Sequence, residues 1–163
     1  MIDLPASAAK VQAALDQAKV KASVQTFPAS TRTAADAAAA IGCSVAQIAK
    51  SLVFKSNRDG RAILVIASGE NRVNERGLSK RIAEELNGDV LGRADADFVR
   101  QETGYAIGGV PPVGHEKPLL TVLDQDLERH DEIWAAAGTP NAVFRISFNQ
   151  LQTLTGGLVC NVT

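Results

Sequence analysis

Twelve residues of this chain, Gly104–His115, combine the two amino acids that most strongly constrain a backbone. The stretch reads GYAIGGVPPVGH and holds four glycines, two adjacent prolines, one tyrosine and one of the chain's two histidines. Glycine permits positive φ and brings N–H groups close to a ligand, whereas proline fixes φ and removes a donor. The pattern is typical of a rigid loop that presents backbone dipoles to a developing charge, and also of a tight connection between strands.

The usual motifs of cofactor-dependent enzymes and hydrolases do not occur in the sequence. It has no GxGxxG after a strand, no GxxxxGK[ST], no HExxH and no GxSxG. Two histidines are too few for a histidine metal cluster, and Cys43 and Cys160 form no CxxC pair. We therefore expect no metal, no cofactor and two buried or half-buried thiols. His130 receives no role, whereas His115 is a candidate for substrate contact.

Length and composition favour one globular domain over residues 1–163. The chain is 45% hydrophobic and 21% charged, which suits a sizeable core. Its longest apolar runs, such as Ala62–Ala67, are too short to cross a bilayer, and the N-terminus lacks a basic region followed by an apolar core. The sequence thus predicts a cytoplasmic protein without a membrane partner.

Charge is unevenly distributed along the chain, although the net charge is only −1. Residues 50–81 carry eight basic and three acidic side chains, whereas residues 101–163 carry three basic and seven acidic ones. A basic sector on a nearly neutral protein suits a limited stretch of phosphate backbone. A solvated surface of mixed charge is the alternative interpretation.

Capping residues and helical spacing predict a series of short helices. Thr33 with Asp36 and Ser44 with Gln47 resemble capping boxes, and Gly42 follows the first of these helices as a stop signal. The expected helices cover approximately Ser7–Val20, Ala34–Ile41, Ser44–Ile48, Glu75–Leu86, Asp95–Gly104 and Phe148–Leu154.

Strands alternate with these helices, but without a regular βαβ repeat. The turn at Asn57–Gly60 predicts a hairpin, and the continuous apolar run of its second strand suits the centre of a sheet. Trp134 and the five phenylalanines are expected in the core. We predict an α+β fold with a mixed, curved, barrel-like sheet surrounded by short helices. The expected strands are Ser23–Phe27, Ser51–Lys55, Ala62–Ala67, Asp89–Leu91, Leu119–Leu123, Glu132–Ala136, Ala142–Ile146 and Leu158–Val162.

Three segments together resemble the YbaK/EbsC family, the free-standing relatives of the bacterial prolyl-tRNA synthetase editing domain, often called ProX-type proteins. They are IAKSLVFK at Ile48–Lys55, ILVIASGENRVN at Ile63–Asn74, and the GYAIGGVPPVGH stretch. The similarity extends from FPASTRTA at Phe27–Ala34 to the C-terminal NAVFRISFNQL. It implies a compact α+β domain around a mixed, barrel-like sheet.

The resemblance also implies an activity, hydrolysis of the ester that links a wrongly attached small amino acid to the 3′ end of a tRNA. The family's lysine at the end of a short helix corresponds to Lys50. Its GxxxP loop corresponds to Gly108, Gly109, Val110, Pro111 and Pro112. We expect backbone N–H groups of Gly108–Val110 to hold the ester carbonyl and the terminal adenosine, and Lys50 to stabilise negative charge on phosphate or on the oxyanion.

Further contacts are assigned to substrate and tRNA. Candidates for the pocket wall or its polar contacts are Thr31, Thr33, Ser51, Phe54 and Ser68, with capping and core roles as the alternative. The candidates for binding the acceptor stem are Lys55, Arg58, Arg72 and Arg76.

Two other functions remain open from the sequence. One is a non-catalytic module that binds a tRNA end or a synthetase, and the other is an esterase for small molecules. A binding module would leave charged tRNA intact, whereas a deacylase would hydrolyse it. A small-molecule esterase would hydrolyse simple esters without depending on tRNA.

Overall fold

Eight strands form one mixed sheet in the computed structural model, which describes residues 4–163. The strands are β1 (Gln25–Thr26), β2 (Ile48–Ser56), β3 (Ala62–Ser68), β4 (Leu91–Arg93), β5 (Leu120–Asp124), β6 (Ile133–Ala136), β7 (Ala142–Ile146) and β8 (Leu158–Cys160). The helices are α1 (Ala6–Gln17), α2 (Ala34–Ile41), α3 (Glu75–Arg81), α4 (Ala96–Thr103) and α5 (Phe148–Thr155), with 3-10 turns η1 (Val45–Gln47) and η2 (Gln125–Arg129).

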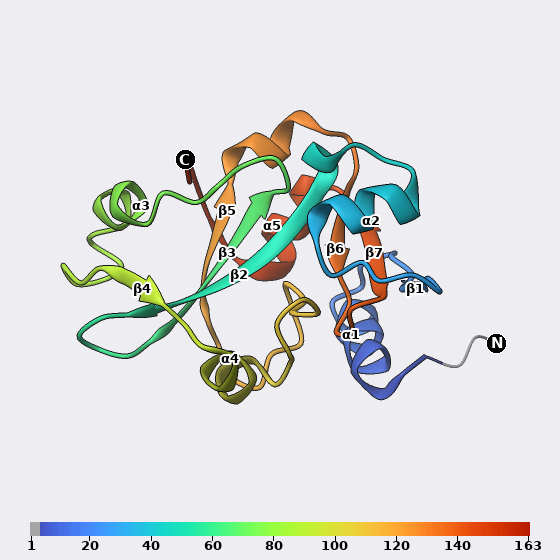
Figure 1. The fold of residues 1–163 in the computed structure, drawn as a ribbon, viewed down its shortest axis with the longest axis horizontal. Helices are drawn as coiled ribbons and strands as arrows, with labels where there is room; N and C mark the ends of the chain where they lie inside the picture. Colours follow the sequence, from blue (N-terminus) through green and yellow to red (C-terminus); the bar gives the residue numbers. More distant parts are fainter. Residues whose placement is uncertain (1–3) are drawn as a thin grey trace.

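The strand order is β1-β7-β6-β2-β3-β5-β8, and β4 pairs with β2 outside this path. The β2·β3 and β6·β7 hairpins are antiparallel, whereas β2·β6, β3·β5 and β5·β8 are parallel. In Figure 1, α3 and β4 lie at one end of the molecule, and α1, α2, β6 and β7 lie at the other. The predicted α+β class with a mixed sheet is confirmed.

β3 is buried along its whole length. Leu64 and Ile66 belong to the core cluster that includes residues of α1 and α5, whereas Ile63 and Val65 belong to the cluster with residues of α3. A strand that packs on both faces needs a continuous apolar run instead of an alternating one. This explains why the segment AILVIA was recognisable as a central strand.

β2 has two neighbours on the side opposite β3, and these leave a gap between them. β6 pairs with Ile48 and Ala49, and β4 pairs with Phe54–Ser56. Within residues 4–163, no strand pairs with residues 50–53 on this side. An interrupted strand edge leaves backbone N–H and C=O groups available to other partners.

The predicted caps are confirmed where the helices begin. The hydroxyl of Thr33 accepts a hydrogen bond from Asp36 N–H, and Gly42 ends α2 with φ +86°. Ser44 and Gln47 form a capping box around η1. Short capped turns of this kind fix the direction in which the chain enters β2.

Three expectations about individual elements were wrong. Lys50 does not end a helix, because η1 stops at Gln47 and Ile48 already has extended geometry. The helix predicted to reach Leu86 is regular only to Arg81, after which the chain continues in turns. Trp134 and three of the five phenylalanines expected in the core, Phe27, Phe54 and Phe98, are only half-buried.

Candidate active site

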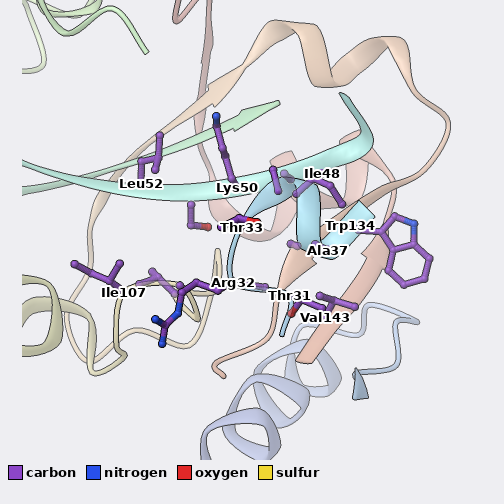
Figure 2. Close-up of a pocket in the computed structure, with 17 residues that line it drawn as sticks. Thr31, Arg32, Thr33, Ala37, Ile48, Lys50, Leu52, Ile107, Trp134 and Val143 are labelled. Atoms are coloured by element: carbon purple, nitrogen blue, oxygen red, sulfur yellow. The ribbon is translucent and has the colours of Figure 1, made fainter. Parts of the chain in front are cut away.

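A cavity of about 190 Å³ lies at the gap beside β2, where Thr31–Thr33, α2, β6 and the Gly104–His115 loop meet (Figure 2). A second hollow of about 170 Å³ adjoins it. The two share Ser51, Leu52, Ile107, Gly108 and Val110. Consecutive residues of β2 line both hollows, although their side chains alternate between the two faces of the sheet. The cavity therefore borders the edge of the strand, where the backbone can meet a ligand.

The register of the β2–β3 hairpin turns the backbone of Ser51 toward this open edge. Gly69 N–H donates to the Ile48 carbonyl at 2.8 Å, and Ser56 N–H donates to the Arg61 carbonyl at 2.9 Å. Even-numbered residues of β2 therefore bond to β3, and odd-numbered residues direct their N–H and C=O groups the other way. Ser51 thus offers backbone groups at the cavity.

The hydroxyl of Ser51 adds a polar group to this place. Its Oγ is buried and has no hydrogen-bond partner among the described residues. Buried polar groups in proteins are nearly always hydrogen-bonded, and an unpaired one commonly has a functional reason. Ser51 therefore presents an unpaired buried hydroxyl at this cavity.

Most of the remaining wall is apolar. Ala37 of α2, Ile48 of β2, Val110 of the loop and Val143 of β7 contribute to it. Pockets for drug-sized ligands occupy roughly 300–1,000 Å³, so this cavity suits a smaller group. Such a wall favours a small side chain with little charge.

The Gly104–His115 loop is held in shape by its own side chains. The Tyr105 hydroxyl donates to the Gly114 carbonyl at 2.8 Å. His115 Nε2 lies 2.6 Å from the Pro111 carbonyl oxygen and must donate, because a carbonyl only accepts. Burial lowers the pKa of His115, although this hydrogen bond opposes the shift. Pro112 and His115 line a different hollow, and Pro111 is buried, so all three lie outside the cavity lining.

The three residues at the centre of the loop differ in what they offer a ligand. Gly109 N–H donates to the Ala106 carbonyl at 3.1 Å, and its carbonyl accepts from Gly138 N–H at 2.9 Å. The N–H groups of Gly108 and Val110 have no acceptor within the described part of the chain. Gly108 and Val110 line the cavity and Gly109 does not, which leaves two of the three expected donors available.

Lys50 lines the cavity, but its ammonium group lies on the other side of β2. Figure 2 shows its side chain on the opposite side of β2 from Arg32 and Ile107. Nζ donates to the Gly69 carbonyl at 3.4 Å. Desolvation by burial lowers the pKa of Lys50, and the negative charge of Asp124 partly opposes this shift. One long hydrogen bond thus holds the cation beside the cavity.

The other predicted pocket residues divide into two groups. Thr31 and Thr33 line the cavity while also serving the fold, because Thr31 bonds to the Pro140 carbonyl and Thr33 caps α2. Phe54 lines the adjoining hollow. Ser68 lies outside both, since its hydroxyl donates to the Ala46 carbonyl and its N–H to Asp124.

None of the four predicted tRNA-binding residues lines the cavity. Lys55 is the closest of the four, along the chain, to the β2 residues that line the cavity. Its Nζ lies 5.0 Å from the centre of the Phe98 ring. Arg58 lies in the turn between β2 and β3, Arg72 follows β3, and Arg76 lies on α3. All four are exposed.

Several lining residues were not singled out from the sequence, chiefly Arg32, Ile107 and Trp134. Arg32 stands between Thr31 and Thr33, which were predicted as pocket residues, and Ile107 lies in the loop but bears an apolar side chain that is 51% exposed. The available sequence signal for Ile107 was a large aliphatic residue within a loop rich in glycine and proline. For Arg32, only its place next to the cap of α2 was visible.

Over residues 4–163, no group of three or more histidine, cysteine, aspartate or glutamate side chains is arranged to hold a metal ion. No helix in that range has the length and apolar character needed to span a membrane.

A family model described as the aminoacyl-tRNA editing domain matches residues 28–154. The match includes α2, β2 and the Gly104–His115 loop, and thus most of the cavity described above. Comparison with solved structures gives the same fold. A crystal structure of a candidate trans-editing enzyme for prolyl-tRNA synthetase is 46% identical, covers 99% of each chain and superimposes with a TM-score of 0.87.

Curated bacterial proteins show the same similarity at lower identity. The Bacillus subtilis protein named "Uncharacterized protein YwhH" is 30% identical over 128 residues, which are 78% of each chain. The Enterococcus faecalis protein EbsC, named as a candidate Cys-tRNA(Pro)/Cys-tRNA(Cys) deacylase, is 24% identical over 131 residues. These residues are 80% of this chain and 77% of EbsC.

Proposed function

The chain belongs to the family of aminoacyl-tRNA editing domains, and on this premise we propose that it is a trans-editing deacylase. Its substrate is a tRNA mischarged with a small amino acid, and the bond that it hydrolyses is the ester at the 3′ end. The observation that carries this proposal is the cavity at the open edge of β2, which brings Ser51 together with the free N–H groups of Gly108 and Val110.

An aminoacyl ester is already activated, so its hydrolysis requires mainly a positioned water and stabilisation of the oxyanion. In our proposal the N–H groups of Gly108 and Val110 donate to the ester carbonyl. The loop contacts of Tyr105 and His115 keep these donors in place. Water attacks the carbonyl carbon, and the ribose hydroxyl of the tRNA leaves with a proton. The neighbouring ribose hydroxyl helps to orient the water.

A second proposal concerns Ser51, whose hydroxyl we assign to the aminoacyl group. Ser51→Ala should reduce kcat/KM about tenfold or more. The aminoacyl group carries a charged α-ammonium, and a hydrogen bond to a charged group contributes about 1.5–3 kcal/mol. The free energy of unfolding should be unchanged or higher, because the variant no longer buries an unpaired hydroxyl. Denaturant titration and deacylation kinetics measure the two effects.

Ser56 supplies the control in the same strand. Its hydroxyl is buried but accepts a hydrogen bond from Arg61 N–H at 2.9 Å. Ser56→Ala should therefore cost stability, about 1–3 kcal/mol, and leave turnover of the folded protein unchanged. A Ser51→Ala protein with lower stability and full activity would assign Ser51 to the fold.

The acceptor stem is assigned to the four exposed basic residues, of which Lys55 lies nearest to the cavity along β2. Each phosphate contact on a tRNA should increase the salt dependence of binding. A prolyl-tRNA synthetase is the proposed source of the mischarged tRNA, supported by the similarity to the trans-editing enzyme for that synthetase.

The proposal is tested with tRNAs charged with alanine, serine, threonine, cysteine or 2-aminobutyrate. We expect hydrolysis of at least one small aminoacyl-tRNA, since an apolar cavity distinguishes a methylene by only about 1–3 kcal/mol. If every charged tRNA remains intact, the protein is a binding module and the proposal is wrong. Equal hydrolysis of simple amino-acid esters would instead indicate a small-molecule esterase.

A further inference from the structure

Arg32 places a cationic side chain at the cavity. It is exposed and lines the cavity beside Gly108. It takes part in none of the ion pairs found within residues 4–163. In Figure 2 its side chain extends from the segment before α2 toward the loop that carries Ile107. Its guanidinium group thus remains available for an anionic ligand.

The segment that carries Arg32 is anchored on both sides. Thr31 donates to the Pro140 carbonyl through its N–H and its hydroxyl. The N–H of Arg32 donates to the Ser30 hydroxyl at 3.2 Å, and Thr33 forms the cap of α2. An anchored backbone limits the positions that the guanidinium can occupy.

The side chain of Arg32 also occupies the space that Gly108 leaves open. A Cβ atom built on Gly108 would lie 2.6 Å from Arg32 Cγ and 3.0 Å from Nε. The guanidinium therefore lies close to Gly108, whose backbone N–H we assign to the ester carbonyl. In an aminoacyl-tRNA, the group one ribose away from that ester is the phosphate on the 5′ side of the terminal nucleotide.

We infer that Arg32 binds the phosphodiester that joins the last two nucleotides of the tRNA, an inference that rests on the proposed function. The planar guanidinium can donate two parallel hydrogen bonds to phosphate oxygens, which a lysine cannot reproduce. Arg32 then acts as a positioning residue. It fixes the terminal ribose so that the ester reaches Gly108 and Ser51.

The test uses two ligands that cannot be hydrolysed. Both are 3′-amino-3′-deoxyadenosine joined to alanine through an amide, and only one carries a 5′-phosphate. Calorimetry should show that the wild-type protein binds the phosphorylated ligand about 10 to 100 times more tightly, as expected for charge-assisted hydrogen bonds. Arg32→Ala should remove this preference, and Arg32→Lys should restore only part of it.

Arg129→Ala is the matched control, because Arg129 is an exposed arginine on η2 that lies outside the cavity lining. It should keep the full preference. The inference is overturned if the phosphorylated ligand does not bind, if wild type shows no preference, if Arg32→Ala retains it, or if that variant loses affinity equally for both ligands.

Hydrolysis is measured separately, so failure of this inference and failure of the proposed function are distinguishable. On charged tRNA, Arg32→Ala should raise KM with little change in kcat and reduce the salt slope of log KM by about 0.7, the value for one single-strand phosphate contact. A preference for phosphate without any hydrolysis would support this inference and contradict the deacylase proposal.

Discussion

Replacing Gly108 with alanine should lower kcat/KM for deacylation by about 10²–10³, the loss that follows removal of one oxyanion donor. Gly108 has φ +92°, a conformation that residues with a Cβ rarely adopt. Alanine would therefore shift the backbone and misdirect the donors at Gly108 and Val110. The new methyl group would also displace Arg32, whose Cγ lies 2.6 Å from the required position.

The fold should survive this change, because the atoms that must move belong to a flexible and exposed side chain. Gly156 provides the control, since it also has positive φ, at +62°, and a Cβ there would meet nothing within 4 Å. Both variants should lose about 1–3 kcal/mol from backbone strain. Only the Gly108 variant should lose activity, and full deacylation by that variant would make the loop a structural connection.

Local sequence signals predicted the parts of this fold that depend on near neighbours. The caps at Thr33 and Ser44 and the turn after β2 each need only a few consecutive residues. The buried run of β3 was visible because a strand covered on both faces needs no alternation. Helix ends were less accurate, as shown by α3, because helical periodicity persists in the turns that follow Arg81.

The open edge of β2 could not be predicted in this way. It results from two strands distant in sequence, β4 and β6, which pair with different parts of β2 and leave a space between them. Spacing identifies a strand but not its neighbours. For the same reason Ser51 and Ser68 were equivalent in the sequence, although only Ser51 faces the cavity without a partner.

Lys50 is the site residue whose geometry departs most from the expectation. The resemblance placed its charge on a phosphate or on the oxyanion, whereas its Nζ bonds to the Gly69 carbonyl. Arg32 is better placed for phosphate, because it lies beside Gly108. We therefore propose that Lys50 acts on the oxyanion, for which Nζ must leave the Gly69 carbonyl and turn around the open edge of β2.

If Lys50 acts in this way, Lys50→Ala should lower kcat/KM about 10²–10³-fold, as expected for loss of a direct donor. Lys50→Met is the companion variant, because it keeps an apolar stem against the cavity wall and removes only the charge. A similar loss in both variants would assign the effect to the ammonium. Near-normal turnover by a folded alanine variant would remove Lys50 from the mechanism.

The pH dependence separates a cationic Lys50 from a neutral one. Burial lowers its pKa from the ordinary value of 10.5, so the ammonium loses its proton at a lower pH than an exposed lysine does. If the cation stabilises the oxyanion, kcat/KM should decrease as pH rises through this lowered pKa. Lys50→Arg, with a pKa above about 12, should retain its activity over the same range.

If the neutral amine is a general base, kcat/KM should instead increase with pH, and Lys50→Arg should be inactive. Rates corrected for spontaneous ester hydrolysis between about pH 7 and 10 decide between these outcomes.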